Sequence, residues 1–120
     1  MLVGHGSKTL GFDDAMQEVA RSLRREKVNW KVTCAFLEAA RPSIPDAIRQ
    51  CVRQGAREVR LLPYFVLTGK HVTQDLPRLA KEAAQKFRSR AKIILCPYLG
   101  FDPKIVSVVK DRLNRIGVSP

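Results

Sequence analysis

Short apolar or β-branched runs alternate with amphipathic helical segments along this chain, and this alternation is the feature that most limits its fold. The runs cover residues 1–4, 30–37, 58–67 and 92–97. Their continuous apolar character is typical of strands that are buried on both faces. Strands joined by crossover helices predict an α/β fold, with a parallel sheet, helices on both faces and flavodoxin-like topology.

The four helical segments each show an apolar face, and two have clear boundary signals. The first segment carries its apolar residues at helical spacing: Phe12, Ala15, Met16, Val19, Ala20 and Leu23. The second begins after Ser43, a plausible N-cap, and ends at Gly55. The third has its apolar face at Leu76, Leu79, Ala80, Ala83 and Phe87. The fourth begins at Asp102-Pro103 and continues through Ile105, Val109, Leu113 and Ile116 to Gly117.

The composition predicts a single domain over residues 1–120. A chain of 120 residues with 45% hydrophobic content is long enough for one core and too short for two. No segment has the length of a membrane helix or the pattern of a signal peptide, so we expect a cytoplasmic protein. Cys34, Cys51 and Cys96 lie in apolar runs without metal-binding spacing, and we interpret them as reduced core residues.

The charge balance is the unusual bulk property. The chain has 22 Lys and Arg against 11 Asp and Glu, a net charge of +11, which favours a polyanionic partner. A small nucleic-acid-binding domain is one such possibility. The aromatic residues argue against it, because we expect them in strands or on apolar helix faces: Trp30, Phe36, Tyr64, Phe65 and Phe87.

Polar residues follow three of the predicted strands. His5 follows the first strand, Glu38 the second, and His71 lies in the loop after the third. A single histidine at such a position is often only a loop residue. Three such groups at neighbouring strand ends are expected to converge, because ligands bind beyond the carboxyl ends of parallel strands. Two imidazoles and a carboxylate suit Co²⁺, Ni²⁺, Fe²⁺ or Zn²⁺, and imidazole can also accept protons near neutral pH.

Other interpretations of the segment around His5 are weaker. Its glycines match neither the dinucleotide-binding nor the P-loop pattern, so a nucleotide site has little support. Ser7 lacks the surroundings of a hydrolase nucleophile. The glycines can also serve simply to let the backbone approach a ligand closely.

Several motifs in order resemble those of the short CbiX-type and SirB-type sirohydrochlorin chelatases, of the class II tetrapyrrole chelatases. The motifs are LVGHGS, FLEAARPSI, LPYFVLTGKHV, DLP and PYLGFDP, and they extend from Leu2 to about Leu113. The resemblance implies two parallel-sheet halves that face each other across a tetrapyrrole cleft. A chain of this length carries one half, so the resemblance implies a homodimer.

The resemblance also assigns roles to residues. It implies that His5, Glu38 and His71 bind the metal and carry the catalysis, and that sirohydrochlorin and a divalent ion are the substrates. Co²⁺ is favoured on family grounds, with Fe²⁺ or Ni²⁺ as alternatives, and no permanent cofactor is expected. Residues expected to contact the carboxylate-rich tetrapyrrole are Gly6, Ser7, Arg41, Gly69 and Lys70. A metal carrier without turnover uses the same three ligands and stays an alternative.

Overall fold

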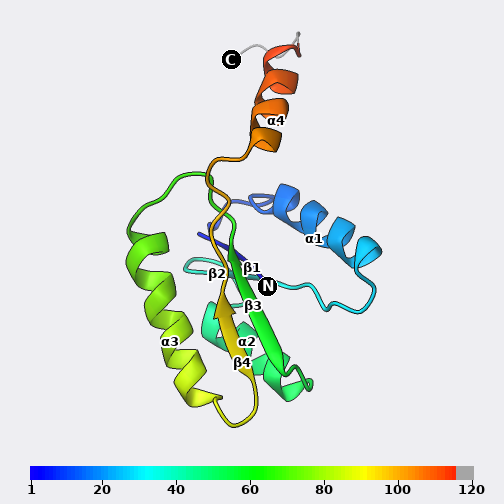
Figure 1. The fold of residues 1–120 in the computed structure, drawn as a ribbon. Coiled ribbons are helices and arrows are strands. Elements are labelled where there is room, and N and C mark those ends of the chain that lie inside the picture. The colour runs from blue at the N-terminus through cyan, green and yellow to red at the C-terminus, as the bar shows by residue number, and fades with distance from the viewer. Residues whose placement is uncertain (116–120) are drawn as a thin grey trace.

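The computed structural model describes residues 1–115, and in them four strands form one parallel sheet. The strands are β1 (Leu2–Gly4), β2 (Cys34–Phe36), β3 (Glu58–Pro63) and β4 (Lys92–Leu95), in the spatial order β2-β1-β3-β4 (Figure 1). This is the flavodoxin-like arrangement that the alternation predicted. The direction of connection reverses between β1 and β3, and open sheets of this kind bind ligands beyond the carboxyl ends of the strands at such a point.

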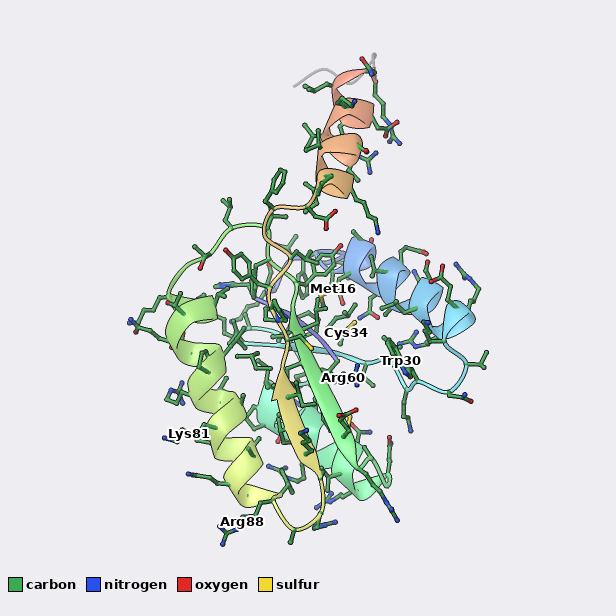
Figure 2. The ribbon with its side chains drawn as sticks, in the orientation of Figure 1. Met16, Trp30, Cys34, Arg60, Lys81 and Arg88 are labelled. Carbon is green, nitrogen blue, oxygen red and sulfur yellow. The ribbon has the colours of Figure 1, made fainter. Side chains whose placement is uncertain are left out.

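Helices pack on both faces of the sheet, as predicted. On one face α1 (Asp14–Glu26) buries Met16 and Ala20 against residues of β1 and β2. Figure 2 shows Met16 and Cys34 between α1 and the sheet, whereas Lys81 and Arg88 point away from the body. On the other face α2 (Ile44–Arg53) and α3 (Leu76–Lys86) enclose the larger core cluster, which includes residues of β1 to β3.

The predicted helix boundaries are confirmed by hydrogen bonds. The Ser43 hydroxyl accepts a hydrogen bond from the Asp46 N–H at 3.3 Å, and α2 gives way to Gly55 with a positive φ of 96°. The Asp102 carboxylate accepts from the Lys104 N–H at 2.8 Å at the start of α4 (Pro103–Leu113). The first helix was predicted to include Phe12, but α1 begins at Asp14. Phe12 precedes the helix and packs edge-on against Phe36.

Three strands are shorter than predicted. Residues 30–33 lie outside β2, and Trp30 is 52% exposed in the connecting loop, not in a strand. The Arg24 guanidinium donates to the Val32 carbonyl at 2.8 and 3.0 Å, which replaces strand pairing there. β3 ends at Pro63, four residues before the predicted limit, and β4 ends at Leu95. The Tyr64 N–H still donates to the Val3 carbonyl at 2.8 Å, after which the chain leaves the sheet.

Helix α4 does not cover the sheet, although the sequence pattern gives it an apolar face. It projects from the end of the molecule where the strands have their carboxyl ends (Figure 1), and none of its residues is buried. Its outer valines, Val106, Val108 and Val109, are 43%, 49% and 50% exposed. An amphipathic pattern requires an apolar surface to cover that face but does not specify which one. The predicted end of this helix, Ile116 and Gly117, lies outside the described residues.

The three cysteines are free thiols, as predicted, but only Cys34 is buried. Burial raises the pKa of the Cys34 thiol above its ordinary value. Cys51 and Cys96 are half-buried, and Cys51 packs against the larger core cluster. Within residues 1–115 no helix has the length and apolar character to cross a membrane.

Candidate metal centre

The first two candidate ligands are brought together by backbone pairing that continues past the ends of β1 and β2. The Leu37 N–H donates to the Gly4 carbonyl at 3.0 Å, and the Glu38 N–H donates to the His5 carbonyl at 3.0 Å. These bonds place the two side chains next to each other. His5 Nε2 then lies 2.7 Å from Glu38 Oε1.

The same junction depends on a glycine. Gly6 has a φ of +107°, and a Cβ atom there would lie 1.7 Å from the Glu38 carbonyl oxygen. No residue with a side chain fits in that space. On the Glu38 side, Ala39 has a positive φ of 59°, which is unusual for a non-glycine residue. The Phe36 N–H donates to the Pro42 carbonyl at 3.0 Å, so the loop that carries Glu38 closes on itself.

The third candidate ligand, His71, begins a short π-helical turn, η1 (His71–Asp75), that leads into α3. The prediction placed it in a loop, and the structure moves it into this turn. Its ring centroid lies 4.7 Å from that of His5, with the ring planes at 64°. His71 Nδ1 lies 2.7 Å from Asp75 Oδ2, which leaves Nε2 for another partner.

His5, Glu38 and His71 therefore converge, as their positions after neighbouring strands predicted. One ligand atom from each lies within 4.8 Å of the others. Two atoms bound to one ion at about 2.1 Å are at most about 4.2 Å apart, so small side-chain rotations suffice to enclose an ion. The three side chains are 47%, 60% and 41% exposed, so a metal and a second molecule can both reach them.

The other predicted site residues lie in the loops that carry this triad. The Ser7 hydroxyl accepts from the Thr9 N–H at 3.0 Å. The Gly69 carbonyl accepts from Val72 and Thr73 at the start of η1. Arg41 and Lys70 are exposed, and within residues 1–115 neither has an ion-pair partner, which leaves both cations available.

Sequence reasoning missed Asp75. The only signal was its position four residues after His71, a spacing that places two side chains together on a helix. Because the segment was expected to be a loop, that spacing did not predict a contact between His71 and Asp75. The contact depends on the π-helical turn, which the pattern of apolar residues does not predict.

Comparisons with known proteins identify the family. A family model described as CbiX matches residues 1–116. The chain is 34% identical over 114 residues to the chloroplastic sirohydrochlorin ferrochelatase of Arabidopsis thaliana, covering 95% of this chain and 50% of that protein. It is 31% identical over 115 residues to the sirohydrochlorin cobaltochelatase of Sulfolobus acidocaldarius, covering 96% of this chain and 89% of that one.

A solved structure of similar fold holds a metal. It is the sirohydrochlorin chelatase SirB from Bacillus subtilis subspecies spizizenii in complex with cobalt, with a TM-score of 0.74 and 31% identity. The match covers 93% of this chain and 47% of that one. The chain thus spans about half the length of the Arabidopsis and Bacillus proteins and most of the Sulfolobus protein.

Proposed function

Because the chain belongs to the CbiX family, we propose that it inserts a divalent metal ion into sirohydrochlorin, with His5, Glu38 and His71 as its metal-binding and catalytic residues. The observation that carries the proposal is the convergence of these three ligands, with one atom of each within 4.8 Å of the others. They come from two loops and the π-helical turn η1 at one end of a parallel sheet, where ligands of such sheets bind.

The ligand set fits an ion that must be passed on. Two imidazoles and one carboxylate leave coordination positions open for water or substrate, and without a thiolate the ion is held reversibly. Insertion also releases two protons from pyrrole nitrogens. As the ion leaves, the imidazole nitrogens and the Glu38 carboxylate regain free lone pairs, and these can accept the released protons.

We assign Co²⁺ as the metal substrate, with Fe²⁺ and Ni²⁺ as alternatives. The ligand chemistry allows all three ions. What supports cobalt is the cobaltochelatase of Sulfolobus, because this chain covers 89% of its length.

The surroundings of the triad suit a flat apolar ring with carboxylate arms. Large apolar side chains are exposed in the loops at this end of the molecule; they include Leu10, Leu67 and Phe101, which are 100%, 81% and 83% exposed. Such side chains can pack on the macrocycle face. We assign the carboxylate arms to Arg41 and Lys70, and closer contacts with the ring to the Ser7 hydroxyl and the backbone of Gly6 and Gly69.

We further propose that residues 1–120 form one domain and that two copies assemble into a homodimer across the tetrapyrrole. The Bacillus relative supports the pairing, because the match covers 47% of that chain and a second copy can take the place of the rest. The uncovered apolar face of α4 also supports it, since this helix projects from the same end as the triad (Figure 1). The cytoplasmic location stays a prediction.

The proposal is tested by anaerobic absorbance assays of sirohydrochlorin with Co²⁺, Fe²⁺ or Ni²⁺. We expect the wild-type protein to accelerate insertion over the spontaneous rate, and His5→Ala, Glu38→Ala and His71→Ala each to remove most of the acceleration. Glu82→Ala is the matched control, because Glu82 is an exposed carboxylate on α3 that pairs only with Arg78 among the described residues. A wild-type rate equal to the blank contradicts the proposal and leaves metal carriage as the better interpretation.

A further inference from the structure

A second carboxylate, that of Asp75, contacts one of the three candidate ligands. His71 Nδ1 and Asp75 Oδ2 are 2.7 Å apart, and the Asp75 side chain is only 27% exposed. Asp75 is not one of the three converging ligands. It is therefore bound to a ligand while it lies outside the ligand set.

The backbone around Asp75 is anchored more firmly than that around His71. The next residue, Leu76, is fully buried in the larger core cluster, and its N–H donates to the His71 carbonyl across η1. His71 lies at the other end of η1, beside an exposed loop that includes Gly69 and Lys70. Asp75 thus lies next to a core residue, and its side chain contacts one that borders the open site.

A simpler role for Asp75 is capping of α3, and the hydrogen bonds do not support it. Asp75 occupies the N-cap position of α3, yet its side chain makes no capping hydrogen bond. Ser43 and Asp102 do make such bonds at α2 and α4. Unlike those two extended residues, Asp75 has helical φ and ψ of -68° and -46°, because η1 continues directly into α3, so its side chain has no free helix end to cap.

We propose that Asp75 is a positioning residue, which fixes the ring orientation of His71 and holds its proton on Nδ1, so that Nε2 presents a lone pair to the metal. A carboxylate accepts hydrogen bonds and cannot donate them when ionised, so the nitrogen beside it must carry the proton. Partners of this kind orient metal-binding histidines, and their loss commonly costs about 10–100-fold in metal affinity. This inference rests on the proposed function only in taking His71 as a metal ligand.

The test compares Asp75→Ala and Asp75→Asn with the wild-type protein, without sirohydrochlorin. Proton–nitrogen NMR at about pH 8, where histidine is ordinarily neutral, reports which ring nitrogen of His71 carries the proton. We expect the proton on Nδ1 in the wild type, and an increased Nε2-protonated fraction in Asp75→Ala. In Asp75→Asn the amide can accept from Nδ1 or donate to it, so we expect an Nε2-protonated fraction between those of the wild type and Asp75→Ala.

The same variants are then titrated with Co²⁺, following the visible absorbance of the ion. We expect affinity to fall about 10–100-fold in Asp75→Ala and less in Asp75→Asn. Asp46→Ala is the matched control, because Asp46 bonds Arg49 one turn away on α2 and lies outside the ligand set. Unfolding curves of each variant separate a loss of orientation from a loss of fold.

The outcomes distinguish this inference from the proposed function. An unchanged His71 tautomer or unchanged Co²⁺ affinity in folded Asp75→Ala overturns the positioning role, whatever the insertion assay gives. If the tautomer and the affinity change as expected while the wild type fails to insert metal into sirohydrochlorin, the positioning role stands and the proposed function falls.

Discussion

Gly6 is the residue on which the first half of the candidate metal centre depends. Its positive φ opposes any side chain, and so does the Glu38 carbonyl oxygen, which would lie 1.7 Å from a Cβ atom. We expect Gly6→Ala to lower the free energy of unfolding by more than about 2 kcal/mol, since the left-handed conformation alone costs about 1–2 kcal/mol. It should also weaken Co²⁺ binding, because the loop that carries Glu38 must move. Urea unfolding and a Co²⁺ titration measure the two effects.

Two other glycines serve as controls for this substitution. Gly55 has a φ of +96° but nothing within 4 Å of a Cβ, so Gly55→Ala isolates the conformational cost, about 1–2 kcal/mol. Gly69 has open space and no positive φ, and Gly69→Ala should change unfolding little. If Gly6→Ala costs no more than Gly55→Ala, the contact with Glu38 does not constrain the site.

Residues differ in how far the sequence could place them. His5, Glu38 and His71 were predictable because each follows a strand, and parallel strands bring their carboxyl ends to one edge. Asp75 was not, because its contact with His71 depends on a π-helical turn. Trp30 was placed in a strand on its apolar character, but the chain needs a loop there to cross from α1 to the sheet.

Among the elements, loss of an apolar side chain should destabilise the protein strongly in α2 and very little in α4. Ile48 of α2 is 1% exposed, so Ile48→Ala should lower the free energy of unfolding by about 2–5 kcal/mol. Val109 of α4 is 50% exposed, and Val109→Ala should change it by less than about 0.5 kcal/mol. Urea unfolding of dilute protein measures both. A large loss in Val109→Ala would show that α4 packs on its own sheet.

The helices also show the limit of pattern analysis at the scale of elements. Ser43, Gly55 and Asp102 marked helix ends correctly because capping depends on neighbouring residues alone. The packing of α4 could not be predicted, because its apolar pattern is the same whichever surface covers it. Local chemistry fixes where a helix begins, whereas its docking depends on the path of the loop before it.

For the whole molecule, association of two copies should depend on α4. We expect the wild type to sediment as a dimer at micromolar concentration, and Val109→Glu to shift it toward monomer, because a charge on the apolar face opposes burial. Glu is tolerated on an exposed helix, so the monomer should stay folded. Arg112→Glu is the control, since Arg112 is an exposed charged residue of the same helix. A wild type that sediments as a monomer contradicts the homodimer.

The net charge of +11 should affect substrate capture more than chemistry. A positively charged surface attracts a polycarboxylate, and salt screens this attraction over about 10 Å at 0.1 M. We therefore expect the KM for sirohydrochlorin to rise with NaCl while kcat changes little. Initial rates at several salt concentrations test this. If kcat falls and KM stays constant, the charge acts on another step.

All three converging ligands belong to a single copy of the chain, and this fixes the stoichiometry of the proposed assembly. A two-fold symmetric pair would hold two complete ion sites around one macrocycle, which accepts only one ion. Each turnover would therefore break the symmetry, with one subunit delivering its ion and the other facing the opposite side of the ring. Separate equilibrium titrations should then saturate at one tetrapyrrole per pair of chains, and at two metal ions per pair of chains.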